Sequence, residues 1–163
     1  MTTAGHPCFV ACRAFGGLLL LLALSSCSFI YEYVVVNESA SPVEVRYGGV
    51  DCCSAQPPEL YTKAAGKLGA NDEPWKAVRA GEISFDPEAG TVRVALQPGE
   101  ALRLITLRYP ASDVENYQTF PLDSLRITGA LGGVSYEGDQ LLPQFKKLHS
   151  TVYGVTYRSK GGK

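Results

Sequence analysis

The sequence has almost no excess charge of either sign: 15 Lys and Arg residues stand against 16 Asp and Glu residues in a chain of 163. Proteins that bind nucleic acid cluster basic residues to neutralise phosphates. Here Arg46, Arg93, Arg103, Arg108 and Arg126 stand singly between apolar residues, a pattern typical of the solvent-facing side of strands. The sequence therefore predicts no nucleic-acid partner.

The sequence is also poor in the groups that build catalytic and metal sites. It contains two histidines and lacks the Gly-x-Ser-x-Gly motif of many serine hydrolases. The pattern around His149 indicates an exposed loop, and the carboxylates Asp72 and Glu73 lie among turn-forming residues. A zinc site would need at least two ligands besides a cysteine pair. We therefore predict that the protein is not an enzyme and holds no metal or cofactor.

No apolar run reaches the roughly 20 residues that a membrane-spanning helix needs. The run at residues 14–24 has 11 consecutive apolar or glycine residues, with Arg13 before it and two serines and Cys27 after it. A positive start, a short apolar centre and a small-residue end are the parts of an export signal. The sequence therefore predicts that the N-terminal segment directs export and is then removed.

The tetrapeptide at residues 24–27, Leu-Ser-Ser-Cys, resembles the lipobox of bacterial lipoproteins. In that family a diacylglycerol is attached to the cysteine thiol and a dedicated signal peptidase cuts directly before it. The resemblance implies cleavage between Ser26 and Cys27, and acyl chains on Cys27 that hold the protein on a membrane. The expected organisation is a lipoprotein signal peptide at residues 1–26 and a single domain at residues 27–163. The alternative is a general secretory signal in which Cys27 is incidental.

The mature chain lacks long amphipathic helical patterns and has short runs with the two-residue alternation of strands. Val43, Val45 and Tyr47 alternate with charged residues, and similar runs recur towards the C-terminus. The three consecutive valines at residues 34–36 predict a central strand that is covered on both faces. We expect this strand to form a hairpin with residues 43–47 across a longer loop, and we expect short helices at residues 58–67 and 142–149, the second ending at the exposed-loop histidine.

One strand changes phase. Leu102 and Leu104 share one face of an extended chain, whereas Ile105 and Leu107 share the opposite face. A bulge near Leu104 and Ile105, a cover on both faces, or a bend from one sheet into another would each explain this. The overall prediction is an all-β fold, a small antiparallel β-sandwich of seven or eight strands that could be immunoglobulin-like. A closed barrel is the alternative.

The irregular segment at residues 48–81 contains the candidate binding residues. Cys52 and Cys53 are adjacent, and in an oxidising compartment they are candidates for a vicinal disulfide or remain a pair of thiols. Tyr61 and Trp75 are aromatic residues outside the clear strand patterns, and we select them as candidates for contact with a ligand or partner. Packing in the core is the alternative for both rings.

Besides the lipobox, the runs VVVNESASPVEV, LQPGEALRL and FPLDSLRITG resemble the small β-sandwich lipoproteins of Bacteroidota. The resemblance implies a location in the cell envelope, and we expect the outer membrane of a Gram-negative bacterium. The predicted function is that of a lipid-anchored, non-enzymatic structural or binding module whose partner is an envelope protein or glycan. One alternative is an enzyme or enzyme-associated domain acting on envelope glycans, which a cleft with Trp75 beside Asp72 or Glu73 would favour. The other is an inhibitor or assembly partner of an envelope protein.

Overall fold

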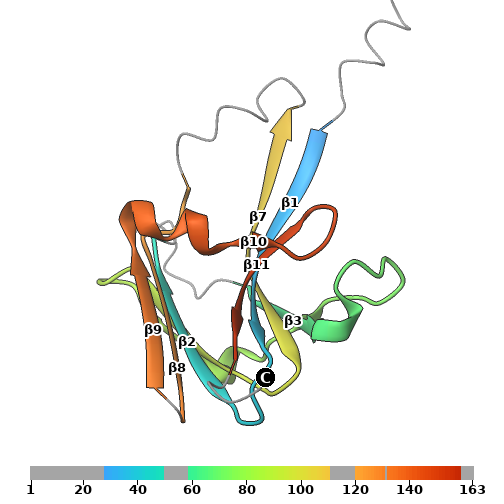
Figure 1. The fold of residues 1–163 in the computed structure, drawn as a ribbon. Coiled ribbons are helices and arrows are strands. Elements are labelled where there is room, and N and C mark those ends of the chain that lie inside the picture. The colour runs from blue at the N-terminus through green and yellow to red at the C-terminus, as the bar shows by residue number, and fades with distance from the viewer. Residues whose placement is uncertain (1–27, 50–58, 111–119, 131, 159–163) are drawn as a thin grey trace, which may run out of the picture.

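The computed structural model describes residues 28–49, 59–110, 120–130 and 132–158. Within these ranges the strands divide into two facing sheets, so the predicted all-β sandwich is confirmed (Figure 1). The expected seven or eight strands are too few, because the described residues form eleven, including two strands of only two residues each. Ser26, Cys27, Cys52 and Cys53 lie outside the described residues. The predictions of lipid attachment, of signal cleavage and of a disulfide therefore stay predictions.

The first sheet has six strands in the order β10-β11-β1-β7-β3-β4. Its members are β1 (Ser28–Asn37), β3 (Tyr61–Ala64), β4 (Lys76–Ala77), β7 (Glu100–Pro110), β10 (Lys146–Lys147) and β11 (Val152–Tyr157). Neighbouring strands are antiparallel, except that β1 and β11 run parallel. This parallel pair is the one departure, among the described strands, from a wholly antiparallel sandwich.

The second sheet has five strands in the order β5-β6-β2-β8-β9, and all its pairs are antiparallel. Its members are β2 (Val43–Gly48), β5 (Ile83–Asp86), β6 (Thr91–Leu96), β8 (Ser124–Gly129) and β9 (Gly132–Glu137). Buried and exposed residues alternate along β2, β6 and β8. One face of this sheet therefore packs on the core and the other is open to water.

The main core lies between the sheets. The side chains that meet there from the five-stranded sheet include Val45, Tyr47, Val94, Leu125 and Ile127, and those from the six-stranded sheet include Tyr33, Val35, Leu102 and Val155. A second, smaller cluster forms on the other face of the six-stranded sheet, where Ala65, Leu68 and Trp75 pack against Val34, Val36, Ala101 and Val152. Strand β1 is therefore covered on both faces, as its three valines predict.

A bulge explains the phase change in β7. The pairing of β7 with β1 shifts between Tyr33 and Val34, whose partners are Ile105 and Arg103, and this skips Leu104. Leu104 is 9% exposed and belongs to the main core, and Ile105 packs against that core. Of the three explanations that the sequence left open, the bulge is thus the one that the structure contains. It lets both sets of apolar residues on β7 face the same core.

The expected hairpin between β1 and β2 is wrong, because the two strands belong to different sheets. The chain crosses between the sheets after Asn37, whose side chain is fully buried. The Asn37 amide donates hydrogen bonds to the backbone oxygens of Ser41 and Leu96, each at 3.0 Å, and its oxygen accepts from the backbone and hydroxyl of Ser39. This buried network satisfies the polar groups of the crossing segment without a hairpin ladder.

The two expected helices are also wrong in their extent. Residues 61–64 form β3, followed by a 3₁₀ turn at Ala65–Lys67, and the second segment has a 3₁₀ turn at Leu142–Gln144 before β10. Strand β3 pairs with β7, and β10 pairs with β11. The hydrogen bonds of these pairs outweigh the weak helical preference of the residues involved. No helix in the described ranges is long and apolar enough to cross a membrane.

Candidate functional site

The candidate site lies on the face of the six-stranded sheet that points away from the main core. The register places Arg103 on β7 opposite Val34 on β1 and opposite Tyr61 on β3. Glu32 is two positions before Val34 on β1, so its side chain is on the same face. Sheet pairing therefore assembles an acid, a base and an aromatic residue from three strands.

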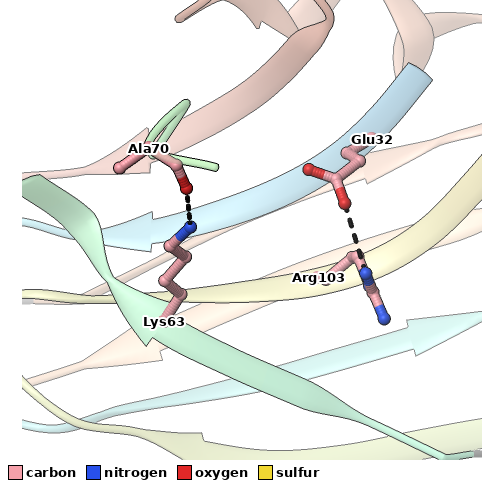
Figure 2. Close-up of polar contacts among 4 residues, drawn as sticks. All are labelled: Glu32, Lys63, Ala70 and Arg103. Carbon is pink, nitrogen blue, oxygen red and sulfur yellow. Dashed lines mark hydrogen bonds and ion pairs between the residues drawn. The ribbon is translucent and has the colours of Figure 1, made fainter. Parts of the chain in front are cut away.

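The guanidinium of Arg103 is the centre of this arrangement. Its Nη1 atom donates a hydrogen bond of 3.2 Å to Oε1 of Glu32, and both side chains are only about one-fifth exposed (Figure 2). The same guanidinium lies 4.5 Å from the ring centre of Tyr61 and 5.0 Å from that of Trp75. A planar cation can contact both rings and a carboxylate at once, which fixes the side chain.

Trp75 reaches the sheet from the segment that follows the 3₁₀ turn at Ala65–Lys67. Its ring packs against the apolar cluster on this face, and the ammonium of Lys63 lies 5.8 Å from the ring centre. Lys63 is only 7% exposed, and its Nζ donates a 2.7 Å hydrogen bond to the backbone oxygen of Ala70 (Figure 2). This hydrogen bond holds the segment around Ala70 against the sheet. The ammonium group of Lys63 has three N–H donors, so others remain for a ligand.

A pocket of about 350 Å³ opens between this segment, the start of β1 and the residues before β11. We call it the outer pocket. Its lining includes Glu32, Lys63, Asn71, Glu73, Trp75, Ser150 and Thr151. The volume is within the range of small-ligand sites, and charged, amide and hydroxyl groups converge beside an aromatic ring. This composition suits a ligand with several hydroxyl groups and an apolar face.

Tyr61 does not line the outer pocket. Its ring contacts Arg103 from the side of β3, and its hydroxyl donates a 2.7 Å hydrogen bond to Oε2 of Glu59. That hydrogen bond and the charge of the Glu59 carboxylate raise the pKa of Tyr61. The role that the geometry gives Tyr61 is therefore to position Arg103 behind the pocket wall.

The outcome for the other candidates is mixed. Trp75 and Glu73 both line the outer pocket, whereas Asp72 does not. His149 is exposed, as the sequence predicts, and its ring lies over Gly69, where a β-carbon would collide with it. Strand alternation could have placed Glu32 and Arg103 on the solvent side, but the contacts of Arg103 with Glu32, Tyr61 and Trp75 depend on strand order, which sequence reasoning did not supply.

A second hollow on this sheet face has less convergent chemistry. This hollow, of about 430 Å³, lies towards the far end of the same sheet face and is lined mainly by small and apolar side chains, with Glu38 its one charged residue. Within the described ranges no three His, Cys, Asp or Glu side chains gather as metal ligands. The prediction of a metal-free protein is not tested by this.

The fold and the outer pocket together define a small all-β sandwich with a charged and aromatic surface pocket. No family model, no curated protein and no solved structure matches the chain.

Proposed function

We propose that the protein is a lipid-anchored, non-enzymatic binding module of the bacterial cell envelope, and that its outer pocket binds an envelope glycan. The observation that carries the proposal is the meeting of Trp75, Glu73 and Lys63 in one pocket. An aromatic ring can contact the apolar face of a sugar while charged groups bond its hydroxyls. The anchor rests on the lipobox resemblance at Cys27.

The geometry of β1 is compatible with a lipid anchor at Cys27 and glycan binding in the outer pocket. Its first residues pair only with β7, because pairing with β11 starts at Glu32, and the two strands project from the body as a ribbon (Figure 1). A strand rises about 3.3 Å per residue, so roughly 13 Å separates Ser28 from Glu32 at the pocket wall. An acylated Cys27 would hold the pocket near a membrane surface, within reach of glycans there.

The anchor is tested by expressing the full chain in a Gram-negative host that processes lipoproteins. We expect the wild-type protein to fractionate with membranes, and inhibition of signal peptidase II to cause accumulation of the precursor. Cys27→Ala should release the protein into the soluble fraction. Unchanged processing and fractionation of Cys27→Ala would show that Cys27 is incidental to an ordinary secretory signal.

The glycan is tested separately, with the mature chain lacking acyl groups and purified peptidoglycan as the probe. We expect the protein to sediment with the insoluble glycan, and Trp75→Ala and Glu73→Gln to reduce the bound fraction. Phe85→Ala is the control, since Phe85 is a half-buried aromatic residue of the other sheet. Equal binding by all variants, or no binding, would contradict glycan recognition at this pocket.

The same experiment tests the enzymatic alternative, which the position of Trp75 and Glu73 in one pocket also favours. A binding module leaves the glycan intact, so no soluble sugar should appear during prolonged incubation. Release of reducing sugar that Glu73→Gln abolishes would instead assign hydrolysis to the outer pocket. The control remains Phe85→Ala, which should behave like the wild-type protein in either case.

A further inference from the structure

The solvent-facing side of the five-stranded sheet has three arginines side by side. Arg46 on β2 lies directly opposite Arg93 on β6 and directly opposite Arg126 on β8. Ser84 on β5 and Ser135 on β9 extend the row to both edges of the sheet. All five residues are exposed. The arginines are distant in sequence, so their grouping results from the register alone.

Repulsion among these three positive charges lowers the stability of the isolated protein. Side chains directly opposite one another on adjacent strands have Cβ atoms about 4.5–5.5 Å apart, and like charges at that separation are destabilising. Arg93 is compensated by Glu44, with 3.6 Å between Nε and Oε1. Within the described part of the chain, Arg46 and Arg126 form no ion pair or side-chain hydrogen bond. A bound anion would relieve the repulsion between them.

A hollow beside the two arginines has room for such an anion. Gly48 lies between Thr91 and Ser124 in the neighbouring row, and a β-carbon on Gly48 would stand 2.8 Å from the Ser124 hydroxyl. Beside this row is a hollow of about 220 Å³. It is lined by Arg46, Thr91, Ser124, Arg126, Ser135 and Glu137.

We propose that this hollow, which we call the phosphate hollow, binds a single phosphate group. The guanidiniums of Arg46 and Arg126 match the oxygens of phosphate in charge and geometry, and the hydroxyls of Thr91 and Ser124 can donate to the same oxygens. Glu137 on the rim opposes a second negative group, which disfavours a chain of phosphates. The proposal does not rest on the proposed function, because the phosphate hollow and the outer pocket lie on different sheets.

Free phosphate and a phosphomonoester lipid headgroup present the same chemistry, so the test has two arms. The mature chain is titrated with inorganic phosphate at fixed ionic strength, and it is mixed with phosphatidylcholine vesicles with and without phosphatidic acid. We expect saturable binding in at least one arm, and the arm that binds identifies the source. Absence of saturable binding in both arms would overturn the proposal.

Variants locate the binding. Arg126→Gln removes one of two guanidiniums from an exposed position, and we expect binding to weaken about tenfold. Arg108→Gln, at an exposed arginine of β7 in the other sheet, is the matched control and should bind like the wild-type protein. Equal weakening by the two substitutions would mean general charge attraction and would refute a defined site.

Two further measurements test the shape and the repulsion. Gly48→Ala keeps every charge but places a methyl group 2.8 Å from the Ser124 hydroxyl, which must then shift from its position in the lining of the phosphate hollow, so a folded Gly48→Ala protein should bind about tenfold more weakly. Binding that is unchanged in this folded variant would refute the hollow as the site. Phosphate should raise the thermal midpoint of the wild-type protein but not that of Arg46→Gln. An equal rise in both would place the anion elsewhere.

Discussion

Replacement of Arg103 by alanine is expected to lower the free energy of unfolding by about 2–3 kcal/mol. Contact with two rings contributes about 0.5–1 kcal/mol for each ring at a partly exposed site. The hydrogen bond to Glu32 is charged on both sides and mostly shielded, since the two side chains are 22% and 21% exposed. It should therefore contribute about 1 kcal/mol, more than most surface pairs.

Two milder substitutions separate these contributions. Arg103→Lys keeps the charge but loses the planar group that contacts Tyr61 and Trp75, so we expect a cost of about 1 kcal/mol. Glu32→Gln keeps an acceptor but removes the negative charge. A double-mutant cycle between Glu32→Gln and Arg103→Ala, each of which removes one charge of the pair, should give a coupling of about 0.5–1 kcal/mol, because direct neighbours are not additive.

The assay is urea unfolding, followed by tryptophan fluorescence and by circular dichroism. Trp75 is the single tryptophan of the chain and contacts Arg103 directly, so its emission reports on this wall of the outer pocket. Arg108→Ala, at an exposed position of the same strand, should change the free energy by less than about 0.5 kcal/mol. If Arg103→Ala costs no more than Arg108→Ala, the described contacts do not stabilise the fold and the reasoning is refuted.

Three other substitutions test the core and the crossing between sheets. Asn37→Ala should cost about 3 kcal/mol in urea unfolding, because it removes four hydrogen bonds, three of them between buried groups; a loss below about 1 kcal/mol would contradict this. Burial raises the pKa of Tyr47, so the folded state keeps a proton that the unfolded state loses above about pH 10, and stability should fall by up to ~1.4 kcal/mol per pH unit there. Tyr47→Phe should reduce that slope in pH-dependent unfolding, and an identical slope would be the contrary result. Leu102→Ala, at a fully buried position, should cost about 2–5 kcal/mol in urea unfolding. Thr106→Ala, at an exposed position of the same strand, should be nearly neutral. Similar costs at both positions would contradict the assigned faces of β7.

Local patterns account for much of the fold. The alternation of Val43, Val45 and Tyr47 with charged residues matches the buried and exposed positions of β2. The three valines of β1 identify a strand with both faces covered, and the phase change in β7 marks the bulge. These features depend on the two-residue period of a strand, which neighbouring residues express directly.

Interpretation of local sequence patterns gave the wrong structure for two connecting segments. The chain after Asn37 has the composition of a hairpin loop, yet it crosses to the other sheet, where the Asn37 amide bonds the backbone of Leu96. Residues 61–64 resemble a helix start but pair with β7 as a strand. In both segments a distant partner supplies the hydrogen bonds, and a turn-forming or weakly helical sequence is compatible with either outcome.

For the candidate sites, too, the sequence predicted which way side chains point but not which residues they contact. The sequence by itself placed Arg46, Arg93, Arg103 and Arg126 on solvent-facing sides of strands, and it selected Trp75 as a candidate for binding. Only the tertiary structure decided that three of these arginines lie side by side and that the fourth meets Glu32 and two aromatic rings. The physical reason is that a strand's own period fixes which way a side chain points. The residues next to that side chain on adjacent strands depend on pairing between distant segments, and a local sequence pattern does not contain this information.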